Sequence, residues 1–201
     1  TSSAAFNHVS MSFKGGVTRF EIDQIQEIFN SILENILHSS AQPLKGKAKV
    51  FLCDSRNPVS QGETKYDHVI TSPPYPNRMT YIRELRPYMY WAGFLDEAKE
   101  AGELDWKAIG GTWGTATSKL KTWVNDEKRL PDELSEVVER IANSGDKNSD
   151  LMAQYVFKYF SDMHKHFAGL KKILNPSSKI DYIVGNSSFY GNLVRAETIM
   201  E

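Results

Sequence analysis

A short apolar run that ends directly in two prolines constrains the fold of this 201-residue chain more than any other feature. Residues 66–71 carry Val69 and Ile70 between polar neighbours, and Ser72, Pro73 and Pro74 follow without a spacer. The run has the length and composition of a strand. Proline has no backbone N–H and cannot continue a sheet ladder, so the strand must stop there. The sequence predicts a buried strand over residues 66–71 that opens into a rigid loop.

Two further short apolar runs also predict buried strands. Residues 49–53 end at Asp54, and residues 180–185 end at Asn186. Each run is followed by polar loop residues, and long amphipathic segments separate the strands along the chain. This alternation predicts an α/β fold with its ligands at the carboxyl ends of the strands. Cys53 is expected to be a small core residue within the first of these runs.

The amphipathic segments suggest how the chain is organised. Helices are predicted over residues 21–37, 81–100, 117–142 and 149–174, from apolar positions at three- and four-residue spacing. Residues 1–20 are polar and contain glycine, so we interpret them as an N-terminal arm. Residues 21–201 then form the main portion, with a helical insertion at about residues 93–148.

Bulk composition limits the core size, the cellular compartment and the mode of nucleic-acid binding that can be expected of the chain. A hydrophobic content of 40% over this length is sufficient for one sizeable core. The only cysteine excludes an internal disulfide and a cysteine-rich zinc cluster, which favours the cytoplasm, and no apolar run has the length of a membrane span. The net charge of -1 means that nucleic-acid binding would need a local basic patch. His164 and His166 point to different faces of a predicted helix, so no metal site is expected.

The segment Thr71, Ser72, Pro73, Pro74, Tyr75 resembles the catalytic motif of S-adenosylmethionine-dependent DNA amino-methyltransferases, in the form typical of cytosine-N4 enzymes. Residues 50–56 and 182–187 resemble the neighbouring sheet strands of that family, so the likeness spans about residues 47–195. The resemblance implies a Rossmann-like methyltransferase sheet with flanking helices, S-adenosylmethionine as cofactor and double-stranded DNA as partner, as in restriction-modification systems. Without this context, the same residues would be interpreted as a rigid turn with a packed tyrosine.

The chemistry of the reaction suits the residues of this motif. An exocyclic amino group is a poor nucleophile because its lone pair is delocalised into the base, so acceptors must draw its hydrogens out of plane. Ser72 Oγ and the Pro73 carbonyl supply acceptors, Pro74 adds rigidity, and Tyr75 offers a flat face for a base that has left the duplex. Methylation of cytosine C5 would require a cysteine nucleophile, and the predicted burial of Cys53 disfavours it.

Cofactor and DNA contacts can also be assigned as candidates. The resemblance implies that Asp54 accepts a hydrogen bond from the cofactor's adenine amino group, with further cofactor contacts from Cys53, Thr71 and Asn186. Asp54 and Asn186 are equally typical of ordinary turns. The candidates for duplex contact are basic, polar or aromatic residues after the motif and in the insertion: Asn77, Arg78, Tyr81, Arg83, Trp113, Lys119 and Lys121. Target recognition is placed in the insertion by position alone.

One element of the family pattern is missing. Neither Gly15-Gly16 nor Gly110-Gly111 lies between a first strand and a helix, where the family carries its Gly-rich cofactor loop. We therefore expect that a second chain or a missing segment carries the loop and that this chain alone binds the cofactor weakly. A degenerate, binding-only member is the other explanation. Three functions stay open: a cytosine-N4 enzyme, an enzyme for adenine N6, RNA or glutamine amino groups, and a non-catalytic DNA-binding subunit that completes a partner's site.

Overall fold

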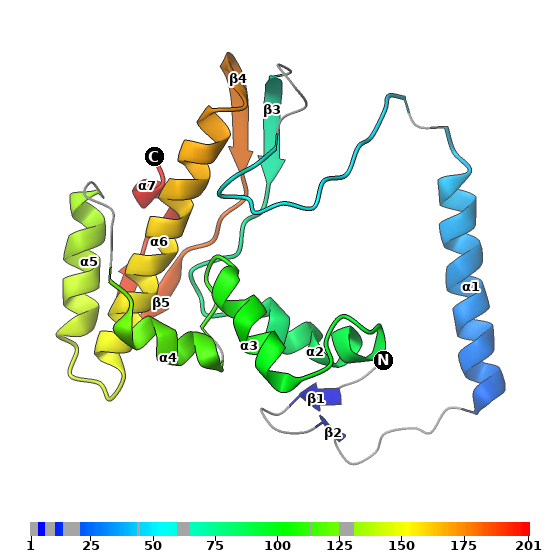
Figure 1. The fold of residues 1–201 in the computed structure, drawn as a ribbon, viewed down its shortest axis with the longest axis horizontal. Helices are drawn as coiled ribbons and strands as arrows, with labels where there is room; N and C mark the ends of the chain where they lie inside the picture. Colours follow the sequence, from blue (N-terminus) through cyan, green and yellow to red (C-terminus); the bar gives the residue numbers. More distant parts are fainter. Residues whose placement is uncertain are drawn as a thin grey trace. The chain divides into compact units, whose positions relative to one another are not determined.

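The computed structural model describes residues 4–6, 11–13, 21–43, 45–59, 65–112, 114–124 and 131–201. The chain divides into two compact units, Thr1–Phe51 and Leu52–Glu201, whose elements are labelled in Figure 1.

The described residues of the first unit form one helix and one pair of short strands. Strands β1 (Ala4–Phe6) and β2 (Met11–Phe13) pair antiparallel. They lie in the segment that the sequence indicates as an arm. The sequence does not indicate these strands, because a strand of three residues is too short to show a periodic pattern. Helix α1 (Ile22–Ser40) confirms the helix predicted from residue 21. It begins at a capping box, in which the Glu21 N–H donates to Gln24 Oε1 at 3.2 Å, and none of its residues is buried.

A parallel strand pair forms the sheet of the second unit. Strand β3 (Tyr66–Thr71) confirms the predicted strand but not its burial, because none of its residues is buried and Ile70 is 71% exposed. It pairs with β4 (Leu174–Tyr182), with Thr71 opposite Tyr182. Strand β4 starts earlier than predicted and includes Pro176, so only the first part of the expected strand at residues 180–185 belongs to it. Two shorter strands, β5 (Ser187–Phe189) and β6 (Asn192–Val194), form an antiparallel hairpin.

Six helices complete the described part of the second unit: α2 (Tyr81–Trp91), α3 (Ala98–Lys107), α4 (Thr115–Thr122), α5 (Asp132–Ala142), α6 (Ser149–Lys171) and α7 (Ala196–Ile199). Two of the predicted helices are each divided in two. The helix expected over residues 81–100 breaks near Gly93, whose positive φ of 73° suits glycine and ends α2. The helix expected over residues 117–142 becomes α4 and α5.

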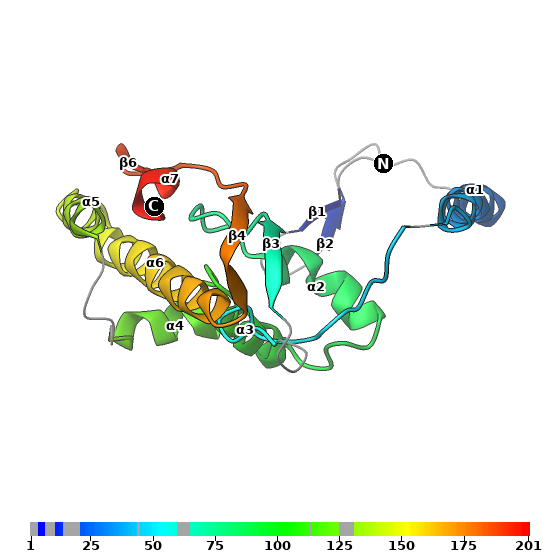
Figure 2. The same cartoon turned by 90° about the horizontal axis from the view of Figure 1, so that it is seen from above.

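The core of the second unit is built around α6. This helix is buried on most of its circumference, with α5 packed along one side and β4 lying beside it in both views (Figures 1 and 2). The buried apolar cluster draws on α4, α5, α6, the β5–β6 hairpin and α7: Leu120, Leu134, Val137, Ile141, Met152, Ala153, Tyr155, Val156, Tyr159, Phe160, Met163, Phe189, Val194, Ala196 and Ile199. The apolar stripe predicted on this helix is therefore confirmed as core.

The buried strand predicted over residues 49–53 is wrong. These residues form no strand, and the side chains of Val50 and Leu52 are 96% and 105% exposed. Cys53 is likewise exposed, which corrects its expected place in the core. An apolar run forms a strand only when a neighbour accepts its ladder hydrogen bonds, and within the described residues β3 and β4 pair only with each other. The described elements form a mixed α/β fold, and none of their helices could cross a bilayer.

Candidate functional site

The SPPY loop, defined as residues 72–78, begins where β3 leaves the sheet. Backbone pairing continues one residue beyond β4, because the Ile183 N–H donates to the Thr71 carbonyl at 2.9 Å. The next residue, Ser72, then bonds through its side chain: Ser72 Oγ lies 3.2 Å from the Ile183 carbonyl oxygen and 3.3 Å from Tyr75 Oη. The prolines end the ladder as predicted and leave the Ser72 hydroxyl at the carboxyl end of the strand.

The hydrogen-bond partners of Ser72 determine the direction of its hydroxyl. A carbonyl oxygen can only accept, so the single Ser72 hydroxyl hydrogen points to Ile183. Toward every other partner, Ser72 Oγ is therefore an acceptor, and Tyr75 Oη donates to it. Ser72 is exposed, so an N–H donor can approach its remaining lone pair.

The ring of Tyr75 lies against the backbone of Gly185. A Cβ added to Gly185 would stand 3.2 Å from Tyr75 Cδ2 and 3.3 Å from Cε2, which is closer than most real Cβ contacts. Glycine therefore allows the ring to approach the chain that follows β4. Tyr75 stays half-buried, so part of its ring remains accessible.

Two buried tyrosines of α6 form hydrogen bonds with the backbone of the SPPY loop. Tyr159 Oη donates to the Pro74 carbonyl at 2.6 Å, and Tyr155 Oη accepts from the Arg78 N–H at 3.0 Å. Burial raises the pKa of Tyr155 to about 12, and burial likewise raises the pKa of Tyr159 well above its usual range. Both hydroxyls therefore stay protonated at neutral pH.

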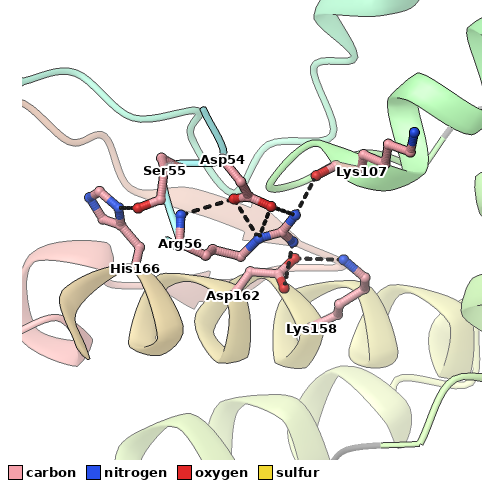
Figure 3. A network of polar contacts seen from close by, with 7 residues as sticks. All are labelled: Asp54, Ser55, Arg56, Lys107, Lys158, Asp162 and His166. Carbon is pink, nitrogen blue, oxygen red and sulfur yellow. Dashed lines mark hydrogen bonds and ion pairs between the residues drawn. The ribbon is translucent and has the colours of Figure 1, made fainter. Parts of the chain in front are cut away.

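A second polar network surrounds Arg56 on the loop that follows residue 53 (Figure 3). The guanidinium donates to both carboxylate oxygens of Asp54, to Asp162 Oδ1 at 3.1 Å and to the Lys107 carbonyl at 2.7 Å. Hydrogen bonding from the Arg56 side chain lowers the pKa of Asp54, and the Asp54 carboxylate raises that of Arg56. One side chain thus ties this loop to α6 and to the end of α3.

The same network extends into α6 and reaches the end of β4. Lys158 Nζ lies 2.6 Å from Asp162 Oδ2 and 4.7 Å from the centre of the Trp106 ring. Further along α6, His166 Nδ1 lies 2.6 Å from the Ser55 carbonyl, and its Nε2 bonds to the Tyr182 hydroxyl. Because the carbonyl only accepts, Nδ1 carries the proton of a neutral His166 ring and Nε2 accepts from Tyr182.

The four predicted cofactor residues occupy different positions. Thr71 pairs with Tyr182 across the sheet, and Tyr182 connects through His166 to Ser55, the neighbour of Asp54. Thr71 and Asp54 are therefore connected only through Tyr182, His166 and Ser55, while Cys53 is exposed. Asn186 uses its carbonyl oxygen to accept from the Ala196 N–H at 2.8 Å and its amide to donate to Glu197 at 2.8 Å, so it caps α7.

The predicted DNA-contact residues are mostly on the surface but differ in their partners. Asn77 accepts from the Met79 N–H at 3.0 Å, Arg83 pairs with Glu84, and Lys119 pairs with Glu103. The residues Arg78, Tyr81 and Lys121 are exposed, and Arg78 has a left-handed φ of 60°. Trp113 lies outside the described residues.

Reasoning from the sequence missed several residues that shape these loops. Tyr155 and Tyr159 belong to an apolar stripe and so were assigned only to the core, although their hydroxyls bond to the loop. A salt bridge between Arg56 and a residue 106 positions away leaves no sequence pattern. The described residues contain no cluster of three potential metal ligands among His, Cys, Asp and Glu.

An open apolar pocket of about 930 Å³ lies apart from the SPPY residues. It is lined by residues of α6, β4, α7 and their neighbours: Pro131, Phe160, Met163, His164, Phe167, Ile180, Tyr182, Val184, Glu197, Ile199, Met200 and Glu201. The lining shares Tyr182 with the polar network but includes no residue of the SPPY loop.

Comparison of the chain with protein-family models, with curated proteins and with solved structures found no match. The site is therefore interpreted from its own residues and their geometry.

Proposed function

We propose that this chain carries the base-binding site of a DNA amino-methyltransferase, with cytosine N4 as the target atom and S-adenosylmethionine as the methyl donor. The observation that carries the proposal is the direction of the Ser72 hydroxyl. Its hydrogen is used by the Ile183 carbonyl, so Ser72 Oγ offers acceptor capacity to a partner that donates N–H. An exocyclic amino group is such a partner, and a ring carbonyl is not.

The residues of the loop have separate tasks in this proposal. Ser72 Oγ and the Pro73 carbonyl accept the two amino hydrogens, which draws them out of the base plane and returns the lone pair to nitrogen. The Tyr75 ring, backed by Gly185, stacks on a base that has been turned out of the duplex. When bound, S-adenosylmethionine supplies a methyl group activated by a positive sulfur. A Rossmann-like continuation of the β3–β4 sheet would be the expected frame.

Two of the candidate cofactor residues, Asp54 and Asn186, already have partners within the chain. Each carboxylate oxygen of Asp54 already accepts two contacts from Arg56, so it would have to release one to bind an adenine amino group. The side chain of Asn186 is occupied at both ends by α7. These contacts favour a second candidate function: a DNA-binding subunit that presents the base while another polypeptide holds the methyl donor.

The test is expression of the full-length protein in a host that lacks DNA methylation, followed by nucleoside mass spectrometry of the digested DNA. N4-methylcytosine is expected with the native protein and is expected to be lost with Ser72→Ala and with Tyr75→Ala. Tyr88→Ala is the matched control, because Tyr88 is an exposed tyrosine of α2 outside the loop. It should leave the methylation level unchanged.

The other outcomes separate the alternatives. N6-methyladenine in place of N4-methylcytosine would retain the amino-methyltransferase and reject cytosine as the target. A folded protein that forms no methylated base, but binds DNA in a way that Tyr75→Ala weakens, would reject the enzyme. It would support the DNA-binding subunit. Equal methylation by the native protein and both loop variants would reject the site.

A further inference from the structure

The two α6 tyrosines contact the SPPY loop on both sides of Tyr75 and in opposite senses. Tyr159 donates to the carbonyl of Pro74, just before Tyr75, and Tyr155 accepts from the N–H of Arg78, just after the turn. Between these points the Asn77 N–H donates to the Tyr75 carbonyl at 2.8 Å. The backbone on both sides of Tyr75 is therefore held by hydrogen bonds.

The support beneath the loop is rigid. Tyr155 and Tyr159 are four residues apart, so they lie on one face of α6, and they are only 2% and 1% exposed. Gly110 packs over both rings, since its added Cβ would lie 3.5 Å from Tyr155 Oη and from Tyr159 Cδ2. Such enclosed rings cannot adopt other rotamers without disturbing the core.

This support also restrains a strained residue at the end of the loop. Arg78 adopts a left-handed φ of 60°, which is unfavourable for a residue with a side chain. The hydrogen bond from its N–H to Tyr155 opposes relaxation of this residue. Conformations of this kind persist where the surroundings over-determine them, and they are concentrated at functional sites.

We propose that Tyr155 and Tyr159 are positioning residues that hold the Tyr75 ring against Gly185, so that the part of the ring that stays accessible receives a flat heteroaromatic base. This inference rests on the proposed function for the identity of the ligand. Neither tyrosine touches the base. Their hydroxyls act through the backbone of the loop, and Gly185 supplies the surface on which the ring lies.

The geometric part is tested by NMR on the full chain, labelled with ¹³C and ¹⁵N. A nuclear Overhauser effect is expected between the Tyr75 ring protons and the Gly185 Hα protons, because these groups are in contact. Tyr155→Phe and Tyr159→Phe keep the rings and remove only the hydroxyls. Each should weaken this signal, and the double variant should abolish it. Tyr182→Phe is the matched control, because it removes a hydroxyl that bonds to His166.

The catalytic part is tested with the same variants. The double variant should lower kcat for N4-methylcytosine formation by roughly 10- to 100-fold, while KM for S-adenosylmethionine changes by less than about twofold, as expected for a misplaced reacting group. A purely structural role would lower the melting temperature without this division between kcat and KM.

The outcomes distinguish this inference from the proposed function. Loss of the Tyr75–Gly185 signal in the double variant but not in the control supports the positioning role, even if the native chain shows no methylation and the proposed function fails. Retention of the signal in the folded double variant overturns it. Loss of the signal with unchanged kcat would also overturn it.

Discussion

Arg56 and Asp162 are 106 positions apart in the sequence and form an ion pair, in which Arg56 Nη1 lies 3.1 Å from Asp162 Oδ1. The Asp162 side chain is buried in α6 and also accepts from Lys158, so a charge-assisted chain runs from the helix to the loop that carries Asp54. This loop has no strand to anchor it. Charged groups therefore contribute to its position beside the contact of the Ser55 carbonyl with His166, and the charged part is sensitive to pH.

Acid should weaken this anchor. Hydrogen bonding from Arg56 lowers the pKa of Asp54 in the folded chain. A carboxylate with a lowered pKa stabilises the fold at neutral pH, and this contribution is lost as the pH falls below the usual carboxylate value of about 4 and through the folded pKa. Urea unfolding between pH 7 and pH 3 should show a shallower acid decline for Asp54→Asn than for the native chain. Parallel declines would contradict the prediction.

The close approach of this loop to α6 requires a glycine. A Cβ at Gly169 would lie 2.5 Å from the Arg56 carbonyl oxygen and 2.8 Å from Pro58 Cδ. Gly169→Ala should therefore destabilise the chain by about 1–3 kcal/mol in urea unfolding, as overpacking does. Helix propensity alone would stabilise this variant by up to about 1 kcal/mol, so the sign of the change in the free energy of unfolding distinguishes overpacking from helix propensity. Ala168→Gly, at the exposed neighbouring position, measures the propensity term.

Alkali should act through the buried tyrosines. Burial raises the pKa of Tyr155 and of Tyr182 to about 12. The folded chain then keeps protons that the unfolded chain releases near pH 10, so this contribution to stability is complete below pH 10 and is lost between about pH 10 and 12. Absorbance titration at 295 nm should show part of the tyrosine ionising only with unfolding. Tyr155→Phe should reduce that late fraction, and titration of every tyrosine near pH 10 in a folded chain would reject the prediction.

The two lysines of α4 should differ in their contribution to DNA binding. Lys119 is paired with Glu103, while Lys121 is exposed. If both face DNA, Lys121→Ala should reduce the slope of log affinity against log salt by about 0.9, and Lys119→Ala by less, because Glu103 already neutralises part of its charge. Fluorescence anisotropy at several salt concentrations measures the slope. Unchanged slopes would remove both residues from a DNA interface.

Local signals in the sequence predicted the elements that depend on local chemistry. Prolines follow the strand at residues 66–71 on its carboxyl side, and both its start and its end were predicted correctly. The stripe that includes Val156 and Met163 repeats at helical spacing, so the central helix was also found. The location of Ser72 at a strand end followed from the apolar run before it and the prolines after it.

Features that depend on distant partners could not be predicted in this way. Val50 and Leu52 have the local composition of a strand, but a strand also requires a neighbour to pair with, and a single run does not report one. The hydrogen bond of the Tyr155 hydroxyl could not be predicted for the same reason, because a tyrosine in an apolar stripe looks the same whether or not its oxygen has a partner. Asn186 was expected directly after a strand over residues 180–185, but β4 ends at Tyr182 and Asn186 stands just before β5. Its capping contact with Ala196 depends on the following hairpin.

The absence of buried residues in α1 has a thermodynamic consequence. In the described part of the chain none of the nineteen residues of α1 is buried, so its capping box and its local side-chain pairs are the contacts that stabilise it there. Such a helix loses its order gradually as the temperature rises, whereas the cluster around α6 should melt in a cooperative transition. The far-ultraviolet circular dichroism of the chain should therefore combine a sloping baseline with a sigmoid, and deletion of residues 22–40 should remove the slope and keep the sigmoid.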